Sequence, residues 1–319
     1  MVTFVGHAIC GHDSVLLGLH RAFSEGSFFS SYLLSGPEHI GKKTLALECI
    51  GLLFCSERKE GEACGSCLGC RHFRAGTHPD FMLISPNPET GIIVIEEVRA
   101  TRSFLNQKPW MGSYKAVLVD NCHALNRNSQ NAILKVLEEP RGNSVFFLVT
   151  SRPMSLLPTL RSRCVSLKSS LVPEPEIASF VGSLGALSDE ASLLATLSRG
   201  KPALAHRLYT NLSYRQKYRE EYEQALSIFT STRAKRLGRL DECSGEGLWN
   251  FLEHSFYIAY SLLRAKYGFN HHLPDKQLSL RYSESELAGI LDAITKAKKG
   301  IESHINSKLL LQNLFLKLK

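Results

Sequence analysis

KAVLVDNCHALNRNSQNAILKVLEEPRGNSVFFLVTSRPMSLLPTLRSRC, residues 115–164, carries the clearest secondary-structure pattern in this chain of 319 residues. Its apolar runs and helical spacing predict a strand, a helix and a strand, over 116–119, 128–139 and 145–150. Asn126 or Asn128 can cap the helix, and Pro140 ends it. A strand, a helix and a strand in so short a segment predict a βαβ unit with parallel strands and a right-handed connection.

Polar residues follow both predicted strands of this unit. Asp120 comes directly after the first strand, and Thr150 and Ser151 close the second. Open parallel sheets bind ligands at the carboxyl ends of their strands. The sequence therefore predicts a ligand site that includes Asp120 and Thr150.

A glycine-rich segment nearer the N-terminus predicts a phosphate-binding loop. A short strand at 32–34 runs into GPEHIGKKT, residues 36–44, and a helix is predicted from 42 to 53. Gly36 and Gly41 allow the backbone to curl so that N–H groups and the helix N-terminus face an anion. Lys42 is placed to reach the phosphates of a nucleotide.

The loop departs from the full phosphate-binding pattern at one position. The pattern requires Ser or Thr directly after the lysine, to hold Mg²⁺. Lys43 stands there, and the hydroxyl of Thr44 comes one residue later, about 100° further around the helix. The alternative is a tight turn from strand to helix that binds no nucleotide.

Four cysteines after this helix predict a metal site. They are spaced as Cx8CxxCxxC, at Cys55, Cys64, Cys67 and Cys70. Four thiolates at such spacing can surround one tetrahedral zinc ion and leave no open position for catalysis. The sequence thus favours a structural Zn²⁺ in a module over 55–70, and four unrelated reduced cysteines are the alternative.

The composition limits the classes of protein to which this chain can belong. The net charge of +8 permits contact with nucleic acid, although an ordinary solvated surface explains it as well. No apolar run approaches the roughly 18–20 residues of a membrane span, and the N-terminus does not read as a secretory signal. Nine cysteines, four of them clustered, favour a reducing compartment over a secreted disulfide scaffold. We expect a cytoplasmic protein.

Several of these segments together resemble one known family. They are GPEHIGKKTLA, the cysteine cluster, HPDF, KAVLVDNCHAL, NSQNAILKVLEEP, FFLVTSRPMSLLPTLRSRC and NSKLLLQNLFLKL. The family is the AAA+ clamp-loader subunits of bacterial DNA polymerase III, which are of a delta-prime or a gamma/tau type. The resemblance covers residues from about 5 to 319 and is densest over 30–165.

The resemblance also implies which type this chain is. A subunit that hydrolyses ATP needs an acid pair after the strand, but Asn121 follows Asp120 here, and an amide is not a general base. The magnesium-binding hydroxyl is displaced as well. The family's sensor arginine would fall near 203–205, where this chain has none, although Arg199 and Arg207 flank that segment. Jointly these changes predict a subunit with a degenerate nucleotide site and no independent ATPase activity.

An arginine beyond the second strand is expected to retain a catalytic role. A helical turn is predicted at 155–159, followed by Leu160 to Cys164. In the resembling family, the arginine of the SRC segment, here Arg163, points towards ATP bound by the neighbouring subunit. Its guanidinium would stabilise charge on the γ-phosphate in trans. The alternative is a surface arginine. The resemblance also implies that Thr150 is the polar residue near the phosphates, and the alternative is that in a degenerate site it only satisfies backbone groups.

The resemblance implies three domains. They are an α/β RecA-like AAA+ domain with the zinc module over 1–168, a small helical lid domain over 169–210, and an all-α collar domain over 211–319. Helices in the last region are predicted over 214–229, 247–267, 284–299 and 303–318. An apolar face formed by Ile305, Leu309, Phe315 and Leu318 belongs either to packing between subunits or to the core of this domain.

The implied function is that of a delta-prime-type scaffold in a hetero-pentamer with gamma/tau and delta subunits. That complex loads the sliding clamp onto primed DNA in the cytoplasm, at the replisome, without a membrane partner. Whether the loop binds ATP or ADP is left open. The alternatives are a gamma/tau-type ATPase and a zinc-dependent nucleic-acid-binding module. The chain ends at the collar without an extension for polymerase or helicase, which also favours the delta-prime type.

Overall fold

Five parallel strands form one sheet in the computed structural model, which describes residues 9–26, 28–58, 62–138, 142–238, 247–268, 276–302 and 306–318. The strands lie in the order β2-β3-β4-β1-β5. Their bounds are Ser31–Ser35 for β1, Phe81–Ile84 for β2, Lys115–Val119 for β3, Ser144–Thr150 for β4 and Val165–Lys168 for β5. The three central strands are buried along their whole length, as expected of a parallel sheet covered on both faces.

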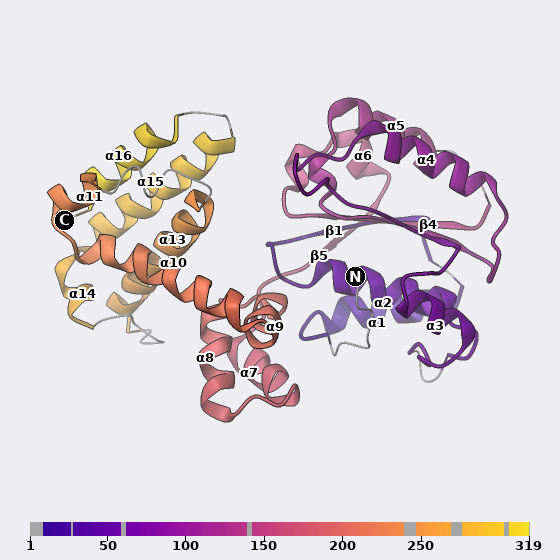
Figure 1. Cartoon of the computed structure of the whole chain (residues 1–319), viewed down its shortest axis with the longest axis horizontal. Helices are drawn as coiled ribbons and strands as arrows, with labels where there is room; N and C mark the ends of the chain where they lie inside the picture. The colour runs from indigo at the N-terminus through magenta and orange to yellow at the C-terminus, as the bar shows by residue number, and fades with distance from the viewer. Residues whose placement is uncertain are drawn as a thin grey trace. The chain divides into compact units, whose positions relative to one another are not determined.

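Helices cover the two faces of this sheet (Figure 1). One layer contains α1 (Asp13–Ser24), α2 (Lys42–Phe54) and α3 (Leu68–Arg74), and the other contains α4 (Ile95–Asn106), α5 (Arg127–Glu138) and α6 (Pro158–Ser162). Successive residues of a strand point into different layers. In β1, Leu34 packs in one core cluster with Ile50 of α2, whereas Leu33 packs in the other cluster with Ile133 of α5.

The predicted βαβ unit is confirmed in its order of elements and in its parallel strands. Strands β3 and β4 are adjacent and parallel, with Lys115 opposite Ser144, and α5 lies between them in the chain. Of the two candidate caps, Asn126 is the one used, because its Oδ1 accepts a hydrogen bond from the backbone N–H of Ser129 at 2.8 Å. The predicted helix end at 139–140 lies outside the described residues.

The predicted helical turn at 155–159 is wrong in its position. A 3₁₀ turn, η2, occupies Pro153–Ser155, and α6 begins only at Pro158. Leu156 and Leu157 between them are extended. A residue that precedes proline is disfavoured from helical conformation, so Leu157 interrupts the turn that its neighbours would otherwise continue.

Three further helices follow the sheet in the first compact unit, which contains Met1–Tyr209. They are α7 (Glu174–Ser183), α8 (Ser188–Ser198) and α9 (Pro202–Thr210). The start of α9 contacts the glycine loop, because the N–H of Ala203 donates a hydrogen bond to the carbonyl of His39 at 3.1 Å. The segment in which the lid domain is predicted thus touches the loop directly.

The second compact unit, Thr210–Lys319, is helical in its described part. Its helices are α10 (Leu212–Thr230), α11 (Arg233–Gly238), α13 (Leu248–Lys266), α14 (Lys276–Arg281), α15 (Glu284–Glu302) and α16 (Ser307–Lys317). Phe315 and Leu318 are buried in the core of this unit, whereas Leu309 is 61% exposed. Ile305 lies outside the described residues. Most of the described part of the predicted apolar face therefore serves this unit's own core.

None of the described helices combines the length and the apolar composition needed to span a lipid bilayer.

Candidate functional site

The glycine loop joins β1 to α2, and its backbone requires glycine at both ends. Gly36 has a φ of +152°, and a Cβ built there would lie 2.4 Å from the backbone oxygen of Ser169. Gly41 precedes α2 with a φ of +100°, a conformation that L side chains rarely adopt. The two glycines thus allow the tight passage from strand to helix that a phosphate-binding loop requires.

Lys42 closes this loop upon itself. Its side chain is buried, and its Nζ donates hydrogen bonds to the carbonyl oxygens of Gly36 at 2.9 Å and Pro37 at 2.5 Å. Burial lowers the pKa of Lys42 to about 8, although the charges of Glu38 and Asp120 oppose the shift. A bound phosphate would replace the two carbonyls as partner of this ammonium group.

Lys43 pairs with the acid at the end of β3. Its Nζ lies 2.9 Å from Oδ2 of Asp120, and the two side chains are 37% and 15% exposed. Thr44, with the displaced hydroxyl, is the next residue of α2 and is partly buried. The structure therefore brings a cation to Asp120 at the position where the phosphate-binding pattern requires a hydroxyl.

The end of β4 forms a second polar contact of this region. The hydroxyl of Thr150 lies 3.2 Å from Nδ1 of His123 and accepts a hydrogen bond from the N–H of Arg152 at 3.0 Å. Ser151 donates from its hydroxyl to Oε1 of Glu38, in the glycine loop, at 3.2 Å. This hydrogen bond joins the carboxyl end of β4 to the glycine loop.

Positive charge from the following helices also reaches the loop. Burial lowers the pKa of His39; the charge of Glu38 opposes this shift, and those of Lys201, Arg207 and Lys42 add to it. The helical segment that has no arginine at the expected sensor position therefore still places two cationic side chains near the loop.

The side chain of Arg163 contacts α5 and α6. Its Nη2 lies 2.7 Å from Oε1 of Glu138, and its Nη1 donates to the carbonyl of Thr159 at 3.2 Å. The Arg163 and Glu138 side chains are 40% and 41% exposed. Helices α5 and α6 cover the face of the sheet opposite to α2 (Figure 1). The guanidinium of Arg163 is thus accessible to solvent.

The four predicted metal ligands come together. The Sγ atoms of Cys55, Cys64, Cys67 and Cys70 all lie within 4.8 Å of one another. Backbone N–H groups donate to three of the sulfurs, at 3.2 Å for Cys55, 3.3 Å for Cys64 and 3.5 Å for Cys67. Burial raises the pKa of Cys67, but these and neighbouring hydrogen bonds outweigh burial and hold it at about 6. The donor set fits a tetrahedral thiolate site.

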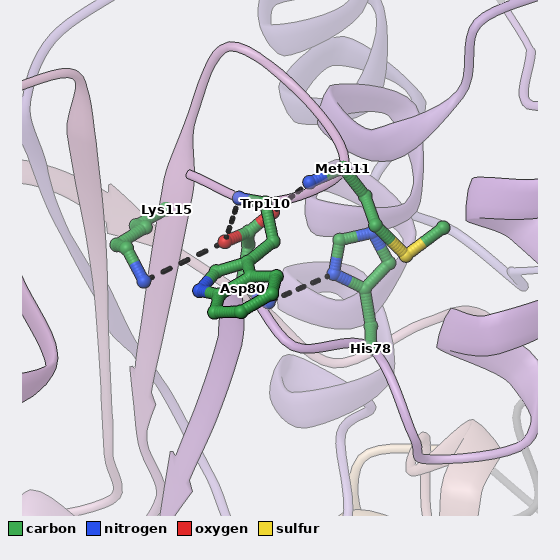
Figure 2. Close-up of polar contacts among 5 residues, drawn as sticks. All are labelled: His78, Asp80, Trp110, Met111 and Lys115. Atoms are coloured by element: carbon green, nitrogen blue, oxygen red, sulfur yellow. Dashed lines mark hydrogen bonds and ion pairs between the residues drawn. The ribbon is translucent and has the colours of Figure 1, made fainter. Parts of the chain in front are cut away.

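A buried carboxylate organises the loop before β3 (Figure 2). Asp80 is fully buried and accepts hydrogen bonds from the N–H groups of Trp110, at 2.8 Å and 3.0 Å, and Met111, at 2.8 Å. Its Oδ1 also lies 3.5 Å from Nζ of the buried Lys115. Nδ1 of His78 accepts a hydrogen bond from the backbone N–H of Asp80 at 3.2 Å. The HPDF segment therefore positions the chain that enters β3.

We expect Asp80→Asn to destabilise the sheet by about 3–5 kcal/mol, because it leaves the Lys115 ammonium buried without its counter-charge. Hydrogen–deuterium exchange of the β2 and β3 amides measures this opening free energy. Adding Lys115→Met should recover part of the loss by removing the second charge. Equal protection of β2 and β3 in the wild type and Asp80→Asn would contradict the role given to this pair.

Comparison with known proteins assigns the family. The family described as "DNA polymerase III, delta subunit" matches residues 11–171, which is half of the chain. The chain belongs to the DNA polymerase III delta subunit family.

Relatives of this delta-family chain include two proteins named DNA polymerase III subunit delta′. The one from Pseudomonas aeruginosa is 39% identical over 184 residues, covering 56% of this chain and 55% of the relative. The one from Escherichia coli is 31% identical over 210 residues, covering 66% and 62%. The DNA polymerase III subunit tau of Escherichia coli is 33% identical over 157 residues, covering 49% and 24%. The chain thus spans less than two thirds of the length of each of these relatives.

Sequence reasoning missed several partners in this delta-family site. The contacts of Lys43 with Asp120, of Glu38 with Ser151 and of Thr150 with His123 join residues far apart in the sequence. One signal was present, because a lysine after the loop lysine and a strand-end carboxylate are oppositely charged groups placed at the same edge of the sheet. The Glu138 partner of Arg163 carried no comparable signal.

Proposed function

We propose that this chain is a delta-prime-type subunit of the DNA polymerase III clamp loader. It acts as a scaffold that does not hydrolyse ATP and donates Arg163 to ATP bound by a neighbouring subunit. The observation that carries the proposal is the Lys43 ammonium group at Asp120, in a site where Asn121 replaces the second acid. The membership of the delta family and the relatives named delta′ support the same reading.

The degenerate site lacks the groups that hydrolysis needs. ATP hydrolysis in such sites depends on a metal held by a hydroxyl and a carboxylate, and on a group that positions or activates water. Lys43 neutralises Asp120 in this chain, and the amide of Asn121 cannot take a proton from water. The other residues of the proposed site, Gly36, Gly41, Lys42 and Thr150, supply binding and shape rather than a base.

Arg163 can serve a neighbour because its present contacts are weak. An exposed ion pair such as the one with Glu138 contributes about 0–1 kcal/mol. A phosphate group offers the planar guanidinium stronger, bidentate hydrogen bonds than the exposed carboxylate does. Exchange of Glu138 for a γ-phosphate is therefore favourable once a neighbour presents one.

The proposed organisation has a RecA-like AAA+ domain over 1–168, a lid over 169–210 and a collar over 211–319. The parallel sheet with helices on both faces supports the first, and the contact of Ala203 with His39 supports a lid beside the loop. A structural Zn²⁺, held by Cys55, Cys64, Cys67 and Cys70, would fix the module between α2 and α3.

The proposed partners are gamma/tau and delta subunits in a hetero-pentamer, with the sliding clamp and primed DNA reached through that complex. The relationship to a protein named subunit tau supports partners built on the same fold. We place the chain at the replisome in the cytoplasm.

Purified protein should show negligible ATP turnover, because the site lacks a base and its acid is neutralised by Lys43. A coupled phosphate-release assay on the full chain measures this, with the gamma/tau subunit of the same organism as a positive control. Turnover comparable to that of the gamma/tau subunit would remove the scaffold proposal in favour of an ATPase.

A further inference from the structure

The glycine loop does not fit the Mg²⁺ that its pattern implies. In a phosphate-binding loop the metal is held by phosphate oxygens, by the hydroxyl of the residue after the loop lysine, and by a strand-end carboxylate. Here that residue is Lys43, and its ammonium nitrogen lies 2.9 Å from Oδ2 of Asp120. One metal ligand is missing, and a cation already contacts the other.

The charge of the Lys43–Asp120 pair also disfavours Mg²⁺ at this site. Lys43 and Asp120 together carry no net charge, so the pair offers no negative field to attract a divalent cation. Asp120 is 15% exposed, and at this degree of burial charges interact more strongly than in open water. Asn121, next in the chain, adds an uncharged amide instead of a second carboxylate.

The same region retains groups that bind anions. Lys42 is buried within the loop, with its ammonium group on the carbonyls of Gly36 and Pro37. The start of α9 is hydrogen-bonded to His39 of the loop through Ala203, and α9 and the residue before it bring Arg207 and Lys201 near. The protein thus supplies several positive charges where a metal nucleotide site relies on Mg²⁺.

We propose that the Lys43 ammonium group is the resident cation of this site and that the loop binds the polyphosphate of a nucleotide without a divalent metal. The inference rests on the proposed function, since it concerns the degenerate site of a subunit that does not hydrolyse ATP. It gives that site a role in nucleotide binding with no metal to support hydrolysis.

The test is binding of ADP and ATP to the full chain by calorimetry, once in EDTA and once in excess Mg²⁺. The wild type should bind in EDTA and gain no affinity from Mg²⁺. Lys43→Ser, which restores the pattern's hydroxyl and frees Asp120, should bind on the order of tenfold more tightly with Mg²⁺ than in EDTA. Lys43→Met, which removes the charge without adding a hydroxyl, is the matched control and should bind more weakly than the wild type in EDTA.

Two results would overturn the inference. One is tighter binding to the wild type with Mg²⁺, since the metal and Lys43 would then share the site. The other is a wild type that binds neither nucleotide under either condition. Both use the wild type alone, so they do not depend on the folding of a variant. Absence of binding would overturn the inference and leave the arginine-donor scaffold standing, whereas ATP turnover by the isolated chain would remove the scaffold proposal and, with it, the metal-free site.

Discussion

Arg163→Ala should lower ATP hydrolysis at the neighbouring site of the reconstituted clamp loader by about 10³-fold, the low end of the range for arginine fingers. In the proposed role the guanidinium would stabilise charge that develops on the γ-phosphate oxygens, and alanine would leave that charge without a partner. The steady-state rate of the whole loader should fall by the share of turnover that this one site contributes. Single-turnover hydrolysis by the assembled loader, with this chain as the only altered subunit, measures the effect.

Two variants separate the finger from the structure around it. Glu138→Ala removes the exposed partner of Arg163 and should leave both folding and hydrolysis close to the wild type. Arg163→Lys keeps the charge but loses the planar fork, so it should recover only part of the rate. Thermal melting of the isolated chain should be the same for Arg163→Ala and the wild type. An unchanged rate of ATP hydrolysis in the loader that contains Arg163→Ala would contradict the trans-acting role of Arg163.

Cys67→Ser should fail to hold the proposed Zn²⁺ of the cysteine module, and the module should unfold. Structural zinc in small peptides contributes about 10–16 kcal/mol to folding near neutral pH, so removal of one of four ligands is a large perturbation. The module is not isolated from the core, because Phe73 of α3 is buried against Phe54 of α2, with ring centroids 5.5 Å apart. We therefore expect α3 to lose protection against hydrogen exchange and both aromatic rings to become exposed.

Metal analysis should find about one zinc per chain in the wild type and far less in Cys67→Ser. Cys10→Ser is the matched control, because Cys10 is a partly buried thiol outside the cluster and should retain the zinc. Hydrogen exchange of residues 62–75 then reports whether the module unfolds with metal loss. A wild-type preparation that is well folded and contains no zinc would contradict the four-thiolate assignment.

The local elements of this fold could be predicted because their signals are local. Apolar runs set the strands, and the spacing of apolar residues set α5, whose predicted start at 128 is one residue from the observed start at Arg127. The turn at 155–159 was misplaced because Pro158, which forces Leu157 to be extended, outweighed the helical pattern.

For the candidate site as well, the sequence predicts the groups of neighbouring residues but not all of their contacts. The residues within the glycine loop are close in sequence, and so are the four cysteines. Their spacing therefore predicts that each group comes together, as the four cysteines do. The spacing of residues in the loop does not predict what Lys42 and Lys43 contact. Lys42 contacts the carbonyls of Gly36 and Pro37, and Lys43 contacts Asp120. The contacts of Lys42 lie within the loop and depend on how the loop curls, whereas the contact of Lys43 with Asp120 depends on how the start of α2 faces the end of β3.

The βαβ unit, the glycine loop, the cysteine cluster and the amide of Asn121 after Asp120 can all be recognised in the amino-acid sequence. Those features depend on neighbouring residues and on chemical identity, which the chain carries without folding. Only the tertiary structure decided that Lys43 neutralises Asp120, that Glu138 holds Arg163, and that Phe315 and Leu318 pack inside their own unit. Such pairings join distant parts of the chain. In the first unit the order of the parallel strands and the helices packed on them determine which side chains meet, and in the second unit the packing of helix on helix does.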